Sequence, residues 1–378
     1  MTREFDWTLL GVAFAISIIG VISIYSATHY TGGASLTLPT QMQSNIWIKQ
    51  LIWMLLGVIL AVLVSNINYH RFWDFAWLFY IASIILLVLV LFRGAERSGA
   101  KRWLEFGYLS FQPVELVKIS IIIILARYFT KQISYHFSQN LYHSNPLILL
   151  RTAFIPLGLV LCPFFLIILQ PDLGSSVVLF PILFAVLFCT HVSRKFLITL
   201  ISLGLASLPF LWQILKDYQK QRLLVFLNPD LDPLGAGYTI AQSKIAIGSG
   251  KLLGKGWLSG TQNQLNFLPE RHTDFIFSII AEEWGFFGSM LILSLFFLLV
   301  WRIIKVILKT NDIFGRIICI GIVALLSFQI LVNIAMSSGM MPVVGLPLPF
   351  ISYGGSSLLL SYLCIGIVLN ISKQRIIF

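Results

Sequence analysis

The stretch LPERHTDFIFSIIAEEWGFFG, residues 268–288, places four carboxylates at the head of a long apolar run. They are Glu270, Asp274, Glu282 and Glu283. Each charge that moves from water into lipid costs roughly 3 kcal/mol on insertion scales. The stretch therefore predicts a membrane helix whose acidic residues either have a function or are neutralised by partners.

The composition of the whole chain agrees with a membrane location. Of the 378 residues, 58% are hydrophobic and 11% are charged, and the mean hydropathy is +0.89. Soluble domains carry about 25% charge. We therefore expect an all-α polytopic membrane protein, with residues 1–378 forming one integral membrane domain. Spans of roughly 20 apolar residues fall near 7–27, 47–65, 73–92, 111–129, 151–169, 172–191, 196–215, 275–300, 314–337 and 351–371.

The distribution of lysine and arginine predicts the orientation. Ten spans place both termini on one side, and cytoplasmic loops are enriched in basic residues. With the termini inside, the cytoplasmic segments hold thirteen of the 26 basic residues: Arg3, Arg71, Arg127, Lys131, Arg151, Arg194, Lys195, Arg302, Lys305, Lys309, Arg316, Lys373 and Arg375. The short outer segments hold five: Lys49, Arg93, Arg97, Lys101 and Arg102. We therefore expect both termini to be cytoplasmic.

A long extracytoplasmic loop, residues 216–274, is predicted between the seventh and eighth helices. No acid occurs between Asp232 and Glu270, whereas Lys251 and Lys255 lie in a glycine-rich segment. The segment GSGKLLGK resembles a phosphate loop, but its spacing is one residue short and it lacks the required Ser or Thr. The loop is either a solvated surface segment or an anion site, and YTIAQSKIAI within it is apolar enough to form an interfacial or re-entrant helix.

A second basic outer loop precedes the fourth span. Arg93, Arg97, Lys101 and Arg102 outnumber Glu96 and Glu105 in this loop. Arginine and lysine bind phosphates through charge-assisted hydrogen bonds. Two basic loops on one membrane face therefore suggest a site for an anionic lipid headgroup, most simply a diphosphate.

Three ionisable residues lie at the predicted outer ends of spans. Glu115 and Lys118 stand three residues apart and share a helix face, so they either form a structural pair or contribute to a site. Asp172 follows Pro171 at the start of a span, where it suits the helix dipole, and helix capping alone would explain it.

Asp274 begins the eighth span at the boundary between water and lipid, where it can contact a polar substrate. Glu282 and Glu283 are predicted to lie roughly 12–13 Å deeper at the helical rise and to pair with polar or basic groups of neighbouring helices. Near the C-terminus, MMPVVGLPLPFISYGGSS, residues 340–357, is rich in proline and glycine. It predicts a broken outer segment that lines a cavity.

Five motifs together resemble the SEDS family of bacterial cell-wall proteins: FQPVELVKI, LQPDLGSS, GAGYTIAQSKIAIGSGKLLGKG, GTQNQLNFLPERHTDFIFSIIAEEWGFFG and PVVGLPLPFISYGGSS. GAKRWLEFGYLSFQPVELVK and PVVGLPLPF are more similar to the elongation branch (RodA) than to the division branch (FtsW). The resemblance implies a peptidoglycan glycosyltransferase that polymerises lipid II, the undecaprenyl-diphosphate-linked disaccharide-pentapeptide, on the outer face of the cytoplasmic membrane. It also implies a class B penicillin-binding protein as partner and membership of the elongation complex. No nucleic-acid partner is expected.

The resemblance also implies roles for residues. Asp274 matches the family's catalytic aspartate within HTDFIF, and we expect it to be the general base. The expected substrate-binding residues are Arg102, Lys118, Lys251 and Lys255 for the diphosphate, Glu115 to orient Lys118, Asp172 to shape the cavity or hold a cation, and Glu270 and His272 beside Asp274. A divalent cation would help to neutralise a diphosphate, but the sequence offers no clear ligand set, so the metal and any cofactor stay open.

Three other readings compete with a polymerase. A lipid II flippase needs polar residues along a path to the inner leaflet, whereas Glu115, Asp172 and Asp274 fall at predicted outer ends. An ion-coupled transporter places its charges near the midplane of an inverted repeat, and we find no convincing repeat. A structural scaffold would not require Asp274, and a division-type member of the same family also stays open.

Overall fold

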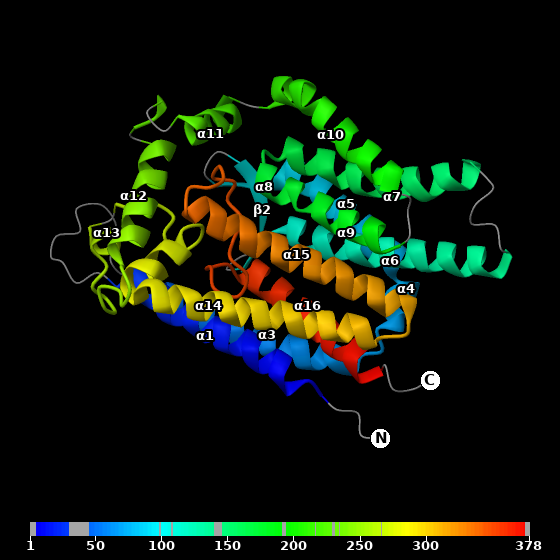
Figure 1. The fold of residues 1–378 in the computed structure, drawn as a ribbon, viewed down its shortest axis with the longest axis horizontal. Helices are drawn as coiled ribbons and strands as arrows, with labels where there is room; N and C mark the ends of the chain where they lie inside the picture. Colours follow the sequence, from blue (N-terminus) through cyan, green and yellow to red (C-terminus); the bar gives the residue numbers. More distant parts are fainter. Residues whose placement is uncertain are drawn as a thin grey trace.

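The computed structural model describes residues 5–29, 45–97, 100–106, 109–139, 146–190, 194–215, 217–228, 231–233, 235–265 and 267–374. Arg3 and Arg375, which entered the count of basic residues, lie outside them. Across these residues the chain is a bundle of helices with one small sheet (Figure 1). The predicted helical class is confirmed.

A helix covers each predicted span. The long helices are α1 (Trp7–Thr28), α3 (Ile46–Asn66), α5 (Ala76–Arg93), α6 (Pro113–Gln139), α7 (Pro146–Leu169), α9 (Leu179–Cys189), α10 (Arg194–Ile214), α14 (Ile276–Lys309), α15 (Ile313–Ser337) and α16 (Gly355–Gln374). Two shorter helices, α4 (His70–Asp74) and α8 (Leu173–Val177), lie between them. Among the described residues, six helices are long and apolar enough to cross a membrane, namely α1, α3, α5, α14, α15 and α16. The count of ten crossings stays a prediction.

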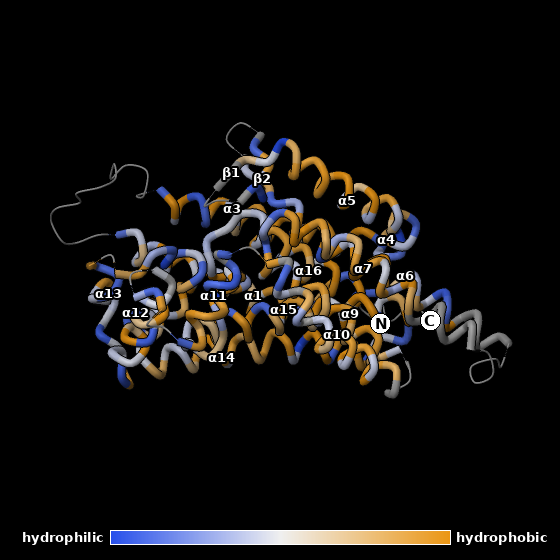
Figure 2. Tube along the Cα trace, turned by 90° about the horizontal axis from the view of Figure 1, so that it is seen from above, coloured by the Kyte–Doolittle hydropathy of each residue, from blue (hydrophilic) through white to orange (hydrophobic). Residues whose placement is uncertain are grey.

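Large apolar side chains remain exposed on the outside of the bundle. On α5, for example, Leu78, Ile81 and Ile85 are all more than half exposed. Hydrophobic residues run along the helices, whereas hydrophilic residues gather at helix ends and in connecting segments (Figure 2). This pattern is expected where lipid rather than water surrounds the helices.

Helices α3 and α16 pack closely because glycines face the partner helix. A Cβ on Gly57 would lie 2.4 Å from the ring of Tyr362, and a Cβ on Gly366 would lie 2.8 Å from the carbonyl of Ala61. Small residues at such contacts let membrane helices approach at backbone distance. Tyr362 then donates a hydrogen bond of 2.9 Å to Ser17 of α1, which ties the three helices together.

The bundle has two ends of different character. At one end, which we call the terminal end, Lys373 of α16 lies over the ring of Phe5, and Asp6 pairs with Arg302 of α14 at 2.6 Å. The start of α1 and the end of α16 therefore lie on the same side. The opposite end, which we call the site end, carries the sheet and the segment 338–354 between α15 and α16.

A three-stranded antiparallel sheet was not predicted from the sequence. It consists of β1 (Ala95–Arg97), β2 (Ala100–Phe106) and β3 (Leu109–Phe111), in the order β1-β2-β3. Leu104 pairs with Phe111 and Glu105 with Ser110. Strands of three to seven residues offer too few alternations for a period of two to be recognised.

Two further segments at the site end agree with sequence expectations. Residues 216–274 contain α11 (Asp217–Leu227), α12 (Ala236–Ser249) and α13 (Thr261–Gln264), and α12 includes YTIAQSKIAI, so the predicted helix is confirmed. The segment 340–354 is not helical, yet Leu346, Leu348 and Phe350 within it are buried. The predicted break is therefore confirmed, and it is enclosed by protein.

Candidate active site

Asp274 lies in a turn that immediately precedes α14, and the segment before α16 fixes this turn. Tyr353 donates its backbone N–H to the carbonyl of His272 at 2.9 Å. The hydroxyl of Ser352 donates to the carbonyl of Thr273 at 2.5 Å. Two consecutive residues of the turn are thus held by a segment about 80 positions away in the chain.

Asn333 of α15 connects the Asp274 turn to the segment before α16. Its side-chain amide donates to the carbonyl of Asp274 at 3.1 Å and to that of Leu346 at 2.8 Å. A Cβ built on Gly345 would lie 3.5 Å from Asp274 Oδ2. The carboxylate therefore faces the glycine of VVGLP.

The pKa of Asp274 is raised to about 6, and burial is the main cause. The negative charge of Glu270 adds to the rise and Asp172 contributes further, whereas Arg222 and Arg102 act in the opposite direction. A pKa near 6 leaves about nine in ten carboxylates ionised at pH 7. Asp274 is therefore suited to accept a proton, because a general base works best with a pKa close to the operating pH.

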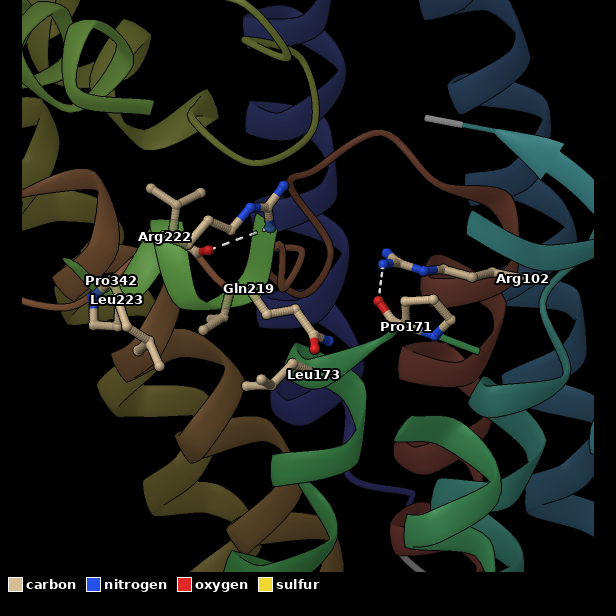
Figure 3. Close-up of a pocket in the computed structure, with 9 residues that line it drawn as sticks. Arg102, Pro171, Leu173, Gln219, Arg222, Leu223 and Pro342 are labelled. Atoms are coloured by element: carbon tan, nitrogen blue, oxygen red, sulfur yellow. Dashed lines mark hydrogen bonds between the residues drawn. The ribbon is translucent and has the colours of Figure 1, made fainter. Parts of the chain in front are cut away.

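Two guanidinium groups lie in one cavity near Asp274. Arg102 comes from β2 and Arg222 from α11, and the segment 342–344 forms part of the wall between them (Figure 3). Arg102 donates to the carbonyl of Pro171, and Arg222 donates to the carbonyl of Val343 at 3.3 Å. The cavity thus presents two positive charges to an anion.

Asp172 lies beside Arg102 and also caps α8. Its Oδ1 accepts from the backbone N–H of Ser175 at 3.2 Å, and Arg102 approaches the same oxygen at 3.9 Å. Gln112 donates to Oδ2 at 3.4 Å. A Cβ on Gly174 would lie 2.2 Å from the carbonyl of Val344, so α8 touches the segment 342–344 directly. Asp172 therefore both caps α8 and lies beside Arg102.

Two residues of this site were not singled out from the sequence. Arg222 was one of seven basic residues in the long loop, and only the position of α11 brings it near Asp274. Gln112 belongs to FQPVELVKI but carries no charge to mark it. Proximity to Pro113 and the helix start was the available signal for Gln112, whereas nothing local distinguished Arg222.

Glu115 and Lys118 form the ion pair that their spacing predicted. Lys118 Nζ lies 2.6 Å from Glu115 Oε1 in α6, and both side chains are buried. Neither of these two side chains lines the cavity of Arg102 and Arg222. In this structure Lys118 is bound to Glu115. To bind a diphosphate, Lys118 would have to break this ion pair or contact Glu115 and the diphosphate at the same time.

Lys251 and Lys255 lie away from the arginines, beside Glu282 and Glu283. Lys255 Nζ contacts Glu282 Oε1 at 2.8 Å, and Lys251 is exposed at the end of α12. The hydroxyl of Ser26, at the end of α1, donates to Glu283. Both glutamates therefore have polar or basic partners, as the sequence predicted. They precede the break of α14 at Gly285, and their depth in the membrane stays a prediction.

Glu270 and His272 flank Asp274 and border a second cavity of about 190 Å³, which Thr28 and Ile46 also line. Glu270 adopts φ 49°, a left-handed conformation that is uncommon for a residue with a Cβ. Burial lowers the pKa of His272, Arg271 lowers it further and Glu270 opposes the change. His272 is therefore a neutral imidazole near pH 7 and can exchange hydrogen bonds with a sugar hydroxyl.

No cluster of three or more His, Cys, Asp or Glu side chains with metal-binding geometry occurs in the part of the chain that the structure describes. Asp274 is accompanied by the carboxylates of Glu270 and Asp172 and by the guanidinium groups of Arg102 and Arg222. The two guanidinium groups supply positive charge at this site.

Comparison with known proteins identifies the family. The model of the cell cycle protein family that comprises FtsW, RodA and SpoVE matches residues 6–376. The chain belongs to the FtsW/RodA/SpoVE family. The peptidoglycan glycosyltransferase MrdB of Escherichia coli K12 is 40% identical over 371 residues, which cover 98% of this chain and 94% of MrdB.

Solved structures of FtsW/RodA/SpoVE proteins share the fold. The rod shape determining protein RodA of Thermus thermophilus has a TM-score of 0.70 at 30% identity, covering 99% of this chain and 98% of RodA. A chain from a peptidoglycan synthase complex, described as coordinating polymerization and crosslinking, has a TM-score of 0.81 at 32% identity, with 99% of both chains covered. The resemblance inferred from the motifs is thus confirmed over the full length.

Proposed function

We propose that this chain is a peptidoglycan glycosyltransferase of the elongation type, which polymerises lipid II on the outer face of the cytoplasmic membrane. Relatives named as peptidoglycan glycosyltransferases and as rod shape determining proteins support the reaction and the branch. The distribution of basic residues supports cytoplasmic termini and a site end on the outer face.

Asp274 acts as the general base in this proposal. A hydroxyl of the acceptor sugar attacks the anomeric carbon of the donor, and its proton passes to a carboxylate oxygen of Asp274. The new bond joins the hydroxyl oxygen to the anomeric carbon. The raised pKa of Asp274 favours this transfer, because a carboxylate with a pKa near 6 is a stronger base than an ordinary aspartate and is still ionised at pH 7.

Arg102 and Arg222 stabilise the leaving group. As the bond from the anomeric carbon to the diphosphate breaks, the electron pair stays on the diphosphate oxygen, where negative charge increases. Fixed positive groups at that position lower the barrier because they need no reorganisation. Gln112 and Asp172 hold Arg102 and the start of α8 in place.

A class B penicillin-binding protein is the proposed partner, and other membrane proteins of the elongation complex would accompany it. The structurally similar chain from a peptidoglycan synthase complex supports a partner that supplies crosslinking.

The single observation that carries the proposal is the convergence of Asp274 with Arg102 and Arg222 at one end of a membrane bundle. The test is glycan-chain formation from labelled lipid II by the purified protein, with and without its penicillin-binding partner. We expect polymer from the wild type. If no polymer forms under either condition while lipid II crosses liposome bilayers, the protein is a flippase and the proposal is wrong.

A further inference from the structure

The break in α14 divides the helix into two parts that serve different purposes. Gly285 takes φ 65° and ψ −156°, a conformation open to glycine alone. The part before it, Ile276–Trp284, starts at the Asp274 turn and ends with Glu282 and Glu283. The part after it continues along the bundle to the terminal end.

The break leaves backbone groups without helical partners, and the loop after α12 satisfies four of them. The carbonyls of Glu282 and Glu283 accept from the N–H groups of Lys255 and Gly256, each at 3.0 Å. On the other side, the N–H groups of Phe286 and Phe287 donate to the carbonyls of Lys251 and Leu252, at 2.9 and 3.2 Å. We call residues 250–262 the clasp, because they bind both sides of the break.

Glycines permit this contact. A Cβ on Gly250 would lie 1.9 Å from the carbonyl of Ala281, and a Cβ on Gly254 would lie 2.1 Å from that of Glu283. The reciprocal Cβ on Gly285 would lie 2.2 Å from the N–H nitrogen of Gly254. Gly250 and Gly254 of GSGKLLGK therefore serve the packing of the loop against the backbone of α14.

The side chain of Glu282 closes the clasp. Its Oε1 accepts from Lys255 Nζ at 2.8 Å, from the Thr261 hydroxyl at 3.1 Å and from the Gln262 backbone N–H at 3.1 Å. Glu282 is fully buried, and its Oε2 has no hydrogen-bond donor among the described residues. Replacing a buried ion pair with apolar groups is often neutral or stabilising. Because burying the charge of Glu282 costs desolvation free energy, we infer that the ion pair with Lys255 has a role other than stabilising the fold.

The clasp also reaches the Asp274 turn by a second route. Asn263, next to the clasp, donates to the carbonyl of Ser26 at 2.8 Å, and Ser26 itself donates to Glu283. Arg271, in the Asp274 turn, donates to the carbonyl of Asn263 at 2.5 Å. In Figure 1 the segments around α12 and α13 lie against the start of α14 and the end of α1.

We propose that Glu282, bound by Lys255, is a positioning residue that fixes the direction of Ile276–Trp284 and thereby the location of Asp274. This inference rests on the proposed role of Asp274 as base. The nine residues from Asp274 to Glu283 span about 13 Å at the helical rise. A tilt of about 5° at the clasp would then move Asp274 by about 1 Å, and a misplacement of that size can cost about 100-fold in rate.

The test compares Glu282→Gln, Lys255→Met and the double variant in lipid II polymerisation. We expect each single variant to lower kcat by about 10- to 100-fold with KM within twofold, because the base is misplaced while lipid II still binds. The double variant should be no worse than the poorer single variant, since the residues act through one contact. Lys255→Arg should restore most of kcat. The matched control is Leu253→Ala, whose side chain is 81% exposed in the same loop and which should behave as wild type.

The pH profile separates positioning from a general loss of folded protein. A displaced Asp274 is less desolvated, so the acid limb of kcat in Glu282→Gln should move to lower pH. Loss of folded protein alone would lower the rate and leave the limb in place, and that result would overturn the inference. So would additive effects of the two single variants, or a raised KM in Lys255→Met, which would assign Lys255 to the diphosphate.

Thr261→Val keeps the inference testable if Glu282→Gln does not fold. It removes one donor to Glu282 and keeps the Lys255 contact, so a decrease of a few-fold in kcat with unchanged KM is expected. Wild-type kcat in a folded Thr261→Val, together with wild-type kcat in Lys255→Met, would overturn the inference. Absence of polymer from the wild type would instead count against the proposed function.

Discussion

Asp274, in the turn before α14, and Glu282, in the first part of that helix, are eight residues apart, yet their surroundings differ in kind. Glu282 is fully buried and is bound by an ammonium group, a hydroxyl and a backbone N–H. Asp274 keeps partial access to solvent, and the arginines that influence it also line a cavity. The protein itself neutralises Glu282, whereas Asp274 is left with part of its interactions still to be made by a ligand.

This difference shows why counting charges in a membrane sequence is not enough to find a site. Both carboxylates carry a similar cost of transfer from water. They differ in the groups that offset this cost. Glu282 has hydrogen-bonding partners in direct contact, whereas Asp274 is stabilised by the charges of arginines farther away. The following predictions test the distinction in order of decreasing effect.

Asp274→Asn should show the largest effect. The amide cannot accept the hydroxyl proton, and loss of a general base typically costs 100- to 10,000-fold. We expect polymer formation from lipid II to fall by about 1,000-fold or more, while elution from a sizing column and helical circular dichroism stay as in wild type. Asp74→Asn, an exposed acid in α4 away from the site, is the matched control. A folded Asp274→Asn that polymerises normally would show that Asp274 is not the base.

Arg102→Ala and Arg222→Ala should each show a smaller loss, of about 10- to 100-fold in kcat/KM, because each removes one of two charges at the diphosphate. Arg222→Lys should keep more activity than Arg222→Ala, since it retains the charge without the planar fork. Steady-state kinetics with lipid II measures both. Equal activity of Arg222→Ala and wild type would show that Arg222, and with it α11, does not contribute to the site.

Gly285→Ala should mainly affect stability. A Cβ there would lie 2.2 Å from the Gly254 nitrogen in a backbone region essentially closed to other residues, so we expect a loss of about 1–3 kcal/mol. Unfolding in detergent should therefore occur at lower temperature. Gly158→Ala is the control, because no atom lies within 4 Å of its Cβ position in α7 and alanine favours a helix by about 0.5–1 kcal/mol. Equal melting temperatures of Gly285→Ala and Gly158→Ala would show that the break in α14 does not require glycine at position 285.

The smallest effect should be a displacement of the pH profile. In the proposed mechanism the ionised form of Asp274 is the active one, so activity should fall as the pH drops through about 6. Glu270→Gln removes a negative charge that raises the pKa of Asp274, so the acid limb should move to lower pH. Arg222→Gln removes a positive charge that lowers it, so the limb should move to higher pH. Shifts in the same direction for both variants would contradict the electrostatic account.

The sequence predicted the fold in outline because a membrane helix is identified by one simple property, a run of apolar residues of sufficient length. All predicted spans coincide with helices, and the proline-rich segment before α16 breaks as expected. The sheet was missed because its strands are short. The break at Gly285 was missed because a glycine in an apolar run is common in membrane helices and only the approach of Gly254 makes it necessary.

The side chains that the structure brings near Asp274 were identified where motifs are local and overlooked where they are not. Asp274, Asp172 and Arg102 lie in motifs that could be read directly, and the structure brings them together. Lys255 was assigned to a diphosphate because its sequence neighbours carry no acid, but its observed partner, Glu282, is 27 positions away. Arg222 was overlooked for the same reason, since its nearness to Asp274 depends entirely on the packing of α11.

The break in α14 also changes the insertion of this helix into the membrane. The part that follows Gly285, Phe286–Lys309, has a length of about 36 Å at the helical rise. The hydrocarbon core of a bilayer is about 30 Å thick. This part alone is therefore long enough to cross the membrane, and Ile276–Trp284 is free to remain in the headgroup region. Neither Glu282 nor Glu283 then has to lie among the lipid chains of the bilayer.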